Sequence, residues 1–214
     1  ALYLAPLFVF FLTLGSAGLL NKKLFILFLL INIPALALTH SRGAWLAVLL
    51  AIFFVFFVKH HSLKKTHVIA LLAVVAVLAI LGGNRLTIQD PSSAAHFDLW
   101  QAGISQIADH PLLGNGLYGF RSALMNQNFE GEPLNYPHNI LLNFWLELGL
   151  LGLVSFAAII FFCIRQYKNR PTVFRLAGAA YLLVLVLHGL VDAPYFKNDL
   201  AVHFWFITSL FYLD

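Results

Sequence analysis

Long apolar segments divide this sequence, and they constrain its fold more than any other feature. Of the 214 residues, 61% are apolar and only 10% are charged. A water-soluble domain needs more polar surface than this composition supplies, so we expect lipid to surround the chain. A membrane-spanning helix takes about 20 apolar residues. Seven segments are candidate spans: residues 2–20, 24–38, 44–58, 67–81, 140–164, 176–190 and 200–213.

These segments predict an all-α fold, a polytopic transmembrane helix bundle of about seven spans. The second, third and seventh segments are short, so we expect them to extend into flanking residues. Residues 1–214 are predicted to form a single membrane domain. The chain opens on an apolar segment at Ala1, with no initiator methionine and no basic leader, which favours a fragment of a larger polytopic protein.

Basic residues orient the predicted bundle, because lysine and arginine are retained on the cytoplasmic side of short connections. Nine of the 13 basic residues lie in every second connection: Lys22, Lys23, Lys59, Lys64, Lys65, Arg165, Lys168, Arg170 and Arg175. The alternate connections hold the others: Arg42, Arg85, Arg121 and Lys197. The long loop of residues 82–139 is therefore predicted to face outward. The net charge of +4 follows from this topology and gives no case for nucleic acid as a partner.

The outward loop contains a predicted amphipathic helix. Phe97, Trp100, Ile104 and Ile107 recur at helical spacing with polar residues between them. Such a helix is expected to lie in the membrane interface. The proline and glycines of residues 110–116 then predict a tight turn that ends the helix.

Motifs for metal or nucleotide chemistry are missing from the sequence. It has no His-Glu-x-x-His zinc pattern, no Walker loop and no carboxylate pair of the glycosidase type. The single cysteine, Cys163, lies in an apolar run and builds neither a disulfide framework nor a cysteine metal site within this chain. We therefore expect neither a metal ion nor a cofactor.

Ionisable residues at membrane depth are costly, which makes them functional candidates. Glu147 recurs with Asn139 and Asn143 every four residues, so the three side chains form one polar stripe that must face protein or water. A structural role and a functional role are equally consistent with this stripe. His188 and Asp192 are also one turn apart, near the outer end of a predicted span, where a packing or solvated role is favoured.

Arg42 and His138 are the sharper candidates. Arg42 lies in an outward turn between two short spans, where it either anchors the chain at lipid headgroups or binds phosphate through its forked guanidinium group. His138 lies where the outer loop meets the fifth span, and an imidazole at such a polar mouth suits a general base. A lone histidine is more often structural, so the residue pattern by itself leaves both roles open.

Three stretches of the chain resemble the O-antigen ligases and the related O-antigen polymerases, which share a C-terminal membrane domain. The first is Ser-Arg-Gly-Ala-Trp-Leu at residues 41–46, similar to a family element between two outer helix ends. The second runs from Asp98 through Pro-Leu-Leu-Gly-Asn-Gly at residues 111–116 to Phe120, similar to an amphipathic helix and its turn. The third is His138 and Asn139, then nine residues, then Gly-Leu-Leu-Gly at residues 149–152, which matches the ligase pattern.

The resemblance implies a multi-pass glycan transferase of the bacterial inner membrane, with residues 82–139 as a catalytic loop facing the periplasm. Such an enzyme moves an oligosaccharide or polysaccharide from undecaprenyl diphosphate to an acceptor hydroxyl, with inversion at the anomeric carbon and without a metal. The implied acceptor is lipid A-core, in lipopolysaccharide biosynthesis, or another glycan or a protein. An O-antigen or exopolysaccharide polymerase and a protein O-oligosaccharyltransferase share these motifs. A transporter or flippase is the alternative from a different class.

The resemblance also implies roles for single residues. Arg42 would stabilise the charge that develops on the departing diphosphate, and His138 would accept the proton of the acceptor hydroxyl. Asn139 would orient that hydroxyl or the sugar, and Glu147 is expected among the substrate-binding residues.

One position departs from the family pattern. His96 stands where family members usually have an arginine that is thought to bind the diphosphate. Histidine is mostly neutral near pH 7 and lacks the guanidinium fork. The implied alternatives are that Arg85 or Arg121 takes over this contact, or that the donor binds more weakly.

Overall fold

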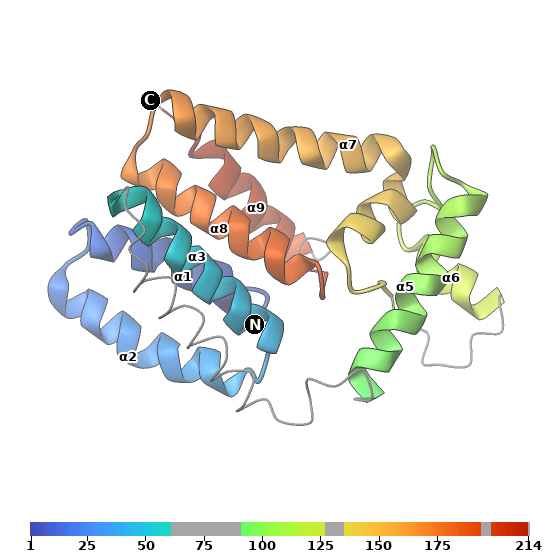
Figure 1. The fold of residues 1–214 in the computed structure, drawn as a ribbon, viewed down its shortest axis with the longest axis horizontal. Coiled ribbons are helices and arrows are strands. Elements are labelled where there is room, and N and C mark those ends of the chain that lie inside the picture. Colours follow the sequence, from blue (N-terminus) through green and yellow to red (C-terminus); the bar gives the residue numbers. More distant parts are fainter. Residues whose placement is uncertain (61–90, 127–134, 194–197, 214) are drawn as a thin grey trace. The chain divides into compact units, whose positions relative to one another are not determined.

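The computed structural model describes residues 1–60, 91–126, 135–193 and 198–213, and every regular element within them is an α-helix (Figure 1). The helices are α1 (Leu4–Ser16), α2 (Lys22–Leu38), α3 (Arg42–His60), α5 (Pro91–Asp109), α6 (Gly119–Asn126), α7 (Ile140–Asn169), α8 (Val173–Gly189) and α9 (Asn198–Ser209). The all-α prediction is therefore confirmed for the described part of the chain.

Six of the seven predicted segments coincide with helices, the first three with α1, α2 and α3 and the last three with α7, α8 and α9. The fourth, residues 67–81, lies outside the described residues. Two helices, α3 and α7, are long and apolar enough to cross a membrane, while α1, α8 and the Leu200–Ser209 part of α9 are apolar but shorter. The count of seven spans and the outward side of the loop stay predictions.

The described chain forms two compact units. The first contains α1, α2, α3, the end of α7 from Cys163, α8 and α9. The second contains α5, α6, the preceding part of α7 and the segment Gly189–Ala193. Each unit has its own apolar core.

Small residues let the helices of the first unit pack closely. Ala44, Ala47 and Ala51 recur on one face of α3 and are at most 1% exposed. They share a core with Ala5 of α1 and Ala180 of α8. Lipid gives helices little hydrophobic reason to associate, so close backbone packing of this kind is what holds a membrane bundle together.

Arg175 is buried near the start of α8 in the same unit. Its Nε donates a hydrogen bond to the carbonyl oxygen of Phe211 at 3.0 Å, and its two terminal nitrogens donate to the carbonyl oxygens of Arg170 and Leu213, each at 2.8 Å. Carbonyl groups at helix ends lack helical partners. The guanidinium group therefore ties the start of α8 to the end of α7 and to the residues after α9.

The core of the second unit joins three helices. Leu99 and Ile107 of α5 pack with Phe120 and Leu124 of α6 and with Leu146 of α7. The predicted helix in the outer loop is thus confirmed as α5, and the unpredicted α6 closes its buried face. The expectation that α5 lies in a membrane interface stays a prediction.

The middle of α7 is interrupted at Gly149, whose φ of 69° and ψ of −171° are not helical. Only glycine adopts this conformation without strain. Such a break frees backbone groups that cannot stay unpaired in an apolar environment. The peptide N–H of Asn115 donates to the Leu146 carbonyl at 2.6 Å, and the N–H of Leu150 donates to the Pro111 carbonyl at 3.2 Å. The predicted turn of residues 110–116 is therefore confirmed. It supplies hydrogen-bond partners for the backbone groups that the break in α7 leaves free.

Glycines on both sides allow this backbone contact. A Cβ atom on Gly114 would lie 2.6 Å from the Gly149 nitrogen and from the Leu146 carbonyl oxygen. A Cβ atom on Gly149 would overlap the carbonyl oxygen of Leu112. The second and third stretches of the family resemblance thus form one substructure, which holds the first part of α7 in place.

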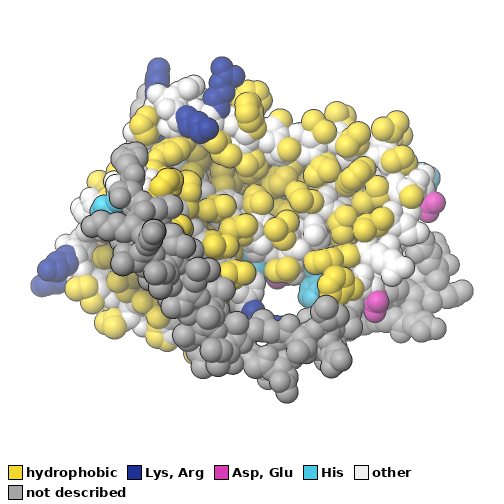
Figure 2. Space-filling view, viewed as in Figure 1, with side chains coloured by type: hydrophobic (Ala, Val, Ile, Leu, Met, Phe, Trp, Pro, Cys, Tyr) yellow, Lys and Arg dark blue, Asp and Glu magenta, His cyan; other side chains and the backbone are white. Residues whose placement is uncertain are grey.

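The long helix α7 also presents an apolar surface. Leu148, Leu151, Val154, Phe161 and Phe162 are all exposed along its length. Figure 2 shows the same helix covered by hydrophobic side chains. Exposed apolar surface of this extent is typical of a helix that contacts lipid or another protein.

Candidate active site

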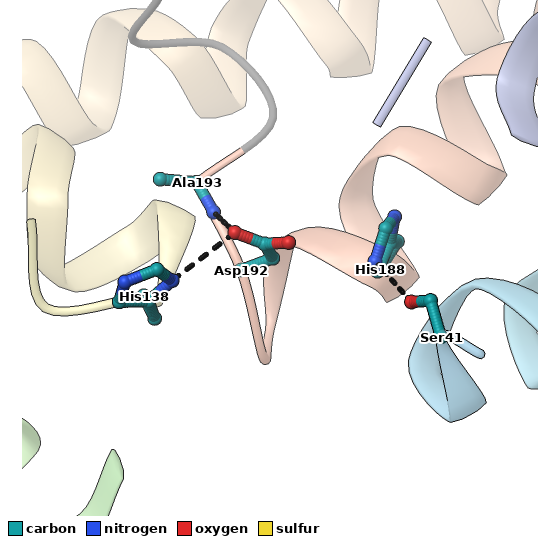
Figure 3. Close-up of polar contacts among 5 residues, drawn as sticks. All are labelled: Ser41, His138, His188, Asp192 and Ala193. Carbon is teal, nitrogen blue, oxygen red and sulfur yellow. Dashed lines mark hydrogen bonds and ion pairs between the residues drawn. The ribbon is translucent and has the colours of Figure 1, made fainter. Parts of the chain in front are cut away.

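His138 lies two residues before the start of α7, and its side chain is paired with a carboxylate from a distant part of the chain. Its Nδ1 lies 3.1 Å from Oδ1 of Asp192, and the two side chains are 30% and 29% exposed (Figure 3). Its backbone φ is 51°, in the left-handed region that non-glycine residues rarely adopt. Such strain persists only where the surrounding structure fixes the backbone. The fold therefore holds His138 in one position beside a carboxylate.

The carboxylate of Asp192 is itself oriented by the backbone. The N–H of Ala193 donates to the same oxygen, Oδ1, at 2.8 Å (Figure 3). An imidazole that donates its Nδ1–H to a carboxylate has its lone pair on Nε2. This is the arrangement of a positioned general base, with the carboxylate stabilising the cation that forms when the base takes a proton.

Asn139 fixes the start of α7 with both ends of its amide. Its Oδ1 accepts the N–H groups of Leu141 at 3.0 Å and Leu142 at 3.2 Å, which makes Asn139 the N-cap of the helix. Its Nδ2 donates to the carbonyl oxygen of Leu190 at 3.1 Å. Leu190 is two residues before Asp192, so this amide ties the segment that carries the histidine to the segment that carries the carboxylate.

His96 of α5 lies beside the base. Its ring meets the His138 ring edge to face, with centroids 5.2 Å apart and planes at 88°. Burial lowers the pKa of His96 below its ordinary value, and the neighbouring His138 lowers it further, while Asp192 acts in the opposite direction. The His96 ring is therefore neutral near pH 7 and offers a hydrogen bond rather than a fixed charge.

Glu147 lies deeper in the same unit. It is 3% exposed, and Asn143 is completely buried. Oε1 of Glu147 and both amide atoms of Asn143 are buried without a hydrogen-bond partner among the described residues. Two residues of the predicted polar stripe, Asn143 and Glu147, thus face protein, while Asn139 is partly exposed. Tyr136, whose ring lies 6.4 Å from that of Tyr118, has a raised pKa because of burial, then the charges of Tyr118 and Glu147.

Arg121 and Arg85 are the other two cations that were predicted to contact the donor. Arg121 of α6 is exposed, and its Nη1 donates to Oδ1 of Asn135 at 3.2 Å. Arg85 lies outside the described residues. The second unit therefore contains His138, Asn139, His96, Glu147 and Arg121, with His138 and His96 in direct ring contact.

Arg42 belongs to the first unit, where it is the first residue of α3. The preceding Ser41 caps this helix, since its Oγ accepts the N–H of Ala44 at 3.3 Å. The same Oγ lies 3.2 Å from Nε2 of the buried His188 of α8 (Figure 3). The turn that carries Arg42 is therefore anchored to α8, and Arg42 lies at the positive end of a helix dipole.

The comparison with known families covers most of this site. A family model described as O-antigen ligase matches residues 24–157, more than half of the chain. The chain belongs to the O-antigen ligase family. The matched range includes the three stretches around Arg42, the 110–116 turn and His138. O-antigen ligases are membrane-embedded, which agrees with the apolar helices of this chain.

Curated relatives share parts of the chain. The O-antigen ligase of Pseudomonas aeruginosa is 30% identical over 112 residues, which are 51% of this chain and 27% of that protein. A Rickettsia felis protein, provisionally named a polysaccharide ligase, is 27% identical over 131 residues, 56% of this chain and 30% of its own length. An uncharacterised Haemophilus influenzae protein is 20% identical over 198 residues, 80% of this chain and 50% of its own length. This chain therefore spans at most half the length of these relatives.

Asp192 is the site residue whose pairing with His138 the sequence did not predict. It lies beyond the family match of residues 24–157, and the sequence favoured a packing or solvated role for it. The one available signal was its outward position in the predicted topology, the same side as His138. Among the described residues, no group of three His, Cys, Asp or Glu side chains is arranged to hold a metal ion.

Proposed function

We propose that this member of the O-antigen ligase family transfers a glycan from an undecaprenyl diphosphate carrier to an acceptor hydroxyl at the periplasmic face of the bacterial inner membrane. The pair of His138 and Asp192 carries this proposal, because a histidine oriented by a carboxylate is suited to deprotonating a hydroxyl group. The family membership supports the ligase-like chemistry.

In the proposed step, Nε2 of His138 takes the proton of the acceptor hydroxyl as its oxygen attacks the anomeric carbon of the donor sugar. The bond between this carbon and the diphosphate oxygen breaks, and undecaprenyl diphosphate leaves with the electron pair. Attack from the face opposite the leaving group inverts the anomeric carbon. The positive charge that His138 acquires is stabilised by Asp192, which is held by the N–H of Ala193.

The departing diphosphate needs fixed positive charge. We assign this role to Arg42, whose guanidinium fork matches phosphate and which lies at the positive dipole end of its helix, α3. Arg121 and Arg85 are the proposed additional contacts with the donor. A diphosphate that gains charge as it leaves is stabilised most by groups that are already in place.

The remaining predicted residues receive polar roles in the proposed reaction. His96 is proposed to bind substrate through a hydrogen bond, since its neutral ring adds no charge. Asn139 is proposed to contact the acceptor from its place beside His138, in addition to capping α7. Glu147 is proposed to bind substrate from the buried side, where its Oε1 has no hydrogen-bond partner among the described residues.

The test separates the base from the diphosphate contact. A general base contributes roughly 10² to 10⁴ in rate and little to donor affinity. His138→Ala should therefore abolish most transfer while the protein still binds lipid-linked glycan. Arg42→Ala should weaken donor binding as well as turnover, and Arg42→Lys should recover only part, because a point charge does not reproduce the forked contact. The measurements are donor binding and glycan transfer in reconstituted full-length protein.

The His138 variant and the Arg42 variant can each contradict the proposal. Wild-type transfer by His138→Ala would remove the catalytic assignment, and unchanged donor affinity in Arg42→Ala would leave that arginine as an interface anchor. The acceptor is tested separately in cells that lack the protein. Accumulation of full-length lipid-linked chains indicates a ligase, whereas accumulation of single repeat units indicates a polymerase.

A further inference from the structure

A cavity of about 320 Å³ lies between α1 and α3 in the first unit, and its described lining includes no residue assigned to the transfer reaction. Its α1 wall is one helical stripe that includes Leu12 and Ser16, and its α3 wall is a stripe that includes Ile52, Phe56 and Lys59. Volumes of this order are typical of pockets that bind small ligands.

The chemistry of the cavity changes along its length. Most of the lining is aliphatic or aromatic, and the polar groups gather where α1 and α3 both end, at Ser16, Lys59 and His60. The His60 ring lies against the Phe56 ring, with centroids 4.4 Å apart. The cavity therefore has an apolar length and a basic mouth, which is the pattern that an amphiphile with an anionic head would match.

The ammonium group at the mouth is held in position. Lys59 Nζ donates to Ser16 Oγ at 2.9 Å, and the same hydroxyl donates to the carbonyl oxygen of Thr13 at 2.9 Å. A lysine has three N–H donors, so two remain for an anionic ligand after this contact. A positioned lysine loses less side-chain freedom on binding than a lysine in solvent does.

We propose that this cavity, defined by Leu12, Ser16, Ile52, Phe56 and Lys59, binds one anionic phospholipid. An acyl chain lies along the apolar walls, and the phosphate contacts Lys59. Burying the chain contributes roughly 0.8 kcal/mol per methylene group that leaves water, but little when the chain comes from a bilayer, so the head contact decides which lipid is retained. By the charge rule this mouth lies on the cytoplasmic face, where anionic lipids are found.

The helix dipoles near the mouth do not cancel its preference for an anionic head group. Carboxyl ends of α1 and α3 carry partial negative charge at the mouth, which disfavours an anion. The amino end of α2 follows α1 after a short connection and brings the opposite partial charge together with Lys22 and Lys23. The full charge of Lys59 therefore sets the sign of the potential at the mouth.

The experiment measures lipid retained by the purified full chain. The protein is reconstituted in phosphatidylethanolamine with phosphatidylglycerol, extracted in mild detergent, and analysed for each lipid by mass spectrometry. Lys59→Gln should lower retained phosphatidylglycerol roughly fivefold, the factor expected from about one basic contact at an anionic lipid surface. Ile52→Trp, which fills the cavity, should remove retention of both lipids.

Matched variants control for charge elsewhere in the unit and for bulk elsewhere on α3. Lys168→Gln removes an exposed charge near the end of α7, and Phe57→Trp enlarges an exposed side chain on another face of α3. Both should retain lipid like the wild type, and detergent thermal stability verifies folding of all four variants. Retention that Lys59→Gln leaves unchanged would overturn the phosphate contact, and retention that Ile52→Trp leaves unchanged would overturn the acyl site.

Discussion

His138 combines three features that rarely coincide in one residue. Its backbone is in the left-handed region, its neighbour Asn139 caps a helix, and its ring is hydrogen-bonded to a carboxylate from another part of the chain. A bulky residue with positive φ costs about 1–3 kcal/mol. The helix cap formed by Asn139 and the hydrogen bond to Asp192 offset that strain. The position of the proposed base therefore depends on both of these contacts.

The Asp192 carboxylate should contribute to rate through its charge. In Asp192→Asn, the Ala193 N–H keeps an oxygen in place, so His138 still has an acceptor for Nδ1–H but loses a charge-assisted bond. Such a bond is about twice as strong as a neutral one, and the difference of about 1–2 kcal/mol predicts a roughly tenfold fall in transfer rate. Asp192→Ala also loses orientation and should fall by roughly 10².

Transfer rate, donor affinity and detergent stability are measured together for these variants. Asp98→Asn, which removes an exposed carboxylate on α5, serves as the control and should transfer like the wild type. A structural role alone would lower stability without the graded loss from Asn to Ala. Equal rates in wild type and Asp192→Ala would disprove the positioning role.

The lowered pKa of His96 makes a prediction about stability and pH. Above the ordinary pKa of 6.5, the ring is neutral in folded and unfolded protein and contributes no pH dependence. Below 6.5 the unfolded chain binds the proton first, because burial holds the folded pKa lower. Stability is therefore expected to fall as the pH falls below 6.5, until the folded ring also takes up a proton.

The measurement compares thermal unfolding of wild type and His96→Gln in detergent between pH 7.5 and 5.5. The wild type should lose more stability over this range, since glutamine does not titrate. His110→Gln removes a histidine that is exposed at the end of α5 and should keep the wild-type slope. Parallel curves for wild type and His96→Gln would contradict the prediction.

For single residues, the sequence predicts which side chains are candidates but not which of them pair. Glu147 was selected because a carboxylate is costly at membrane depth, and Arg42 and His138 because they lie in an outward turn and at the mouth of the outer loop. A single sequence displays these features directly. The pairing of His138 with Asp192 joins residues far apart in the chain, and no periodicity or spacing encodes it. Spacing placed Asp192 one turn after His188, yet the chain leaves α8 at Gly189, so the two do not share a helical face.

At the scale of elements, the broken helix α7 and the 110–116 turn depend on each other. The turn accepts and donates the hydrogen bonds that the break at Gly149 leaves open, and Trp145 adds a third when its Nε1 donates to the Pro111 carbonyl at 2.8 Å. A sequence can predict the turn, since proline and glycine mark it. It cannot predict the break, because Gly149 and Gly152 in an apolar run are equally typical of a continuous spanning helix.

Gly149→Ala should destabilise the second unit strongly. The new Cβ requires an unfavourable backbone conformation and also overlaps the Leu112 carbonyl, so we expect a loss of about 4 kcal/mol or more. Gly116→Ala is the matched control, because its φ of 80° is also positive but nothing lies within 4 Å of the added atom. It should cost only about 1–2 kcal/mol. Similar losses of thermal stability in the two variants would show that the close backbone contact does not matter.

At the scale of the whole molecule, composition and hydropathy predicted a helical membrane protein, and the described residues agree. The helices form because apolar runs of sufficient length are bounded by caps and turns, such as Asn21, whose side chain accepts the N–H groups of Lys23 and Leu24 at the start of α2. Two compact units were not predicted, and one of their boundaries falls inside the apolar helix α7, where the sequence changes little.

The sidedness of the chain is the prediction on which the proposed site depends. Charge asymmetry predicts that the loop with His138 lies outside and the end of α7 inside.

In Met125→Cys, the new thiol replaces a side chain that is 63% exposed on α6, so an impermeant maleimide should label it in intact cells. In Lys168→Cys, the thiol lies on the exposed end of α7 and should react only after permeabilisation. The native Cys163 is completely buried and should stay unlabelled in the parent chain. Labelling of Lys168→Cys from outside and of Met125→Cys only after permeabilisation would reverse the topology. A reversed topology would put His138 and Asp192 in the cytoplasm, on the wrong side for the proposed periplasmic transfer.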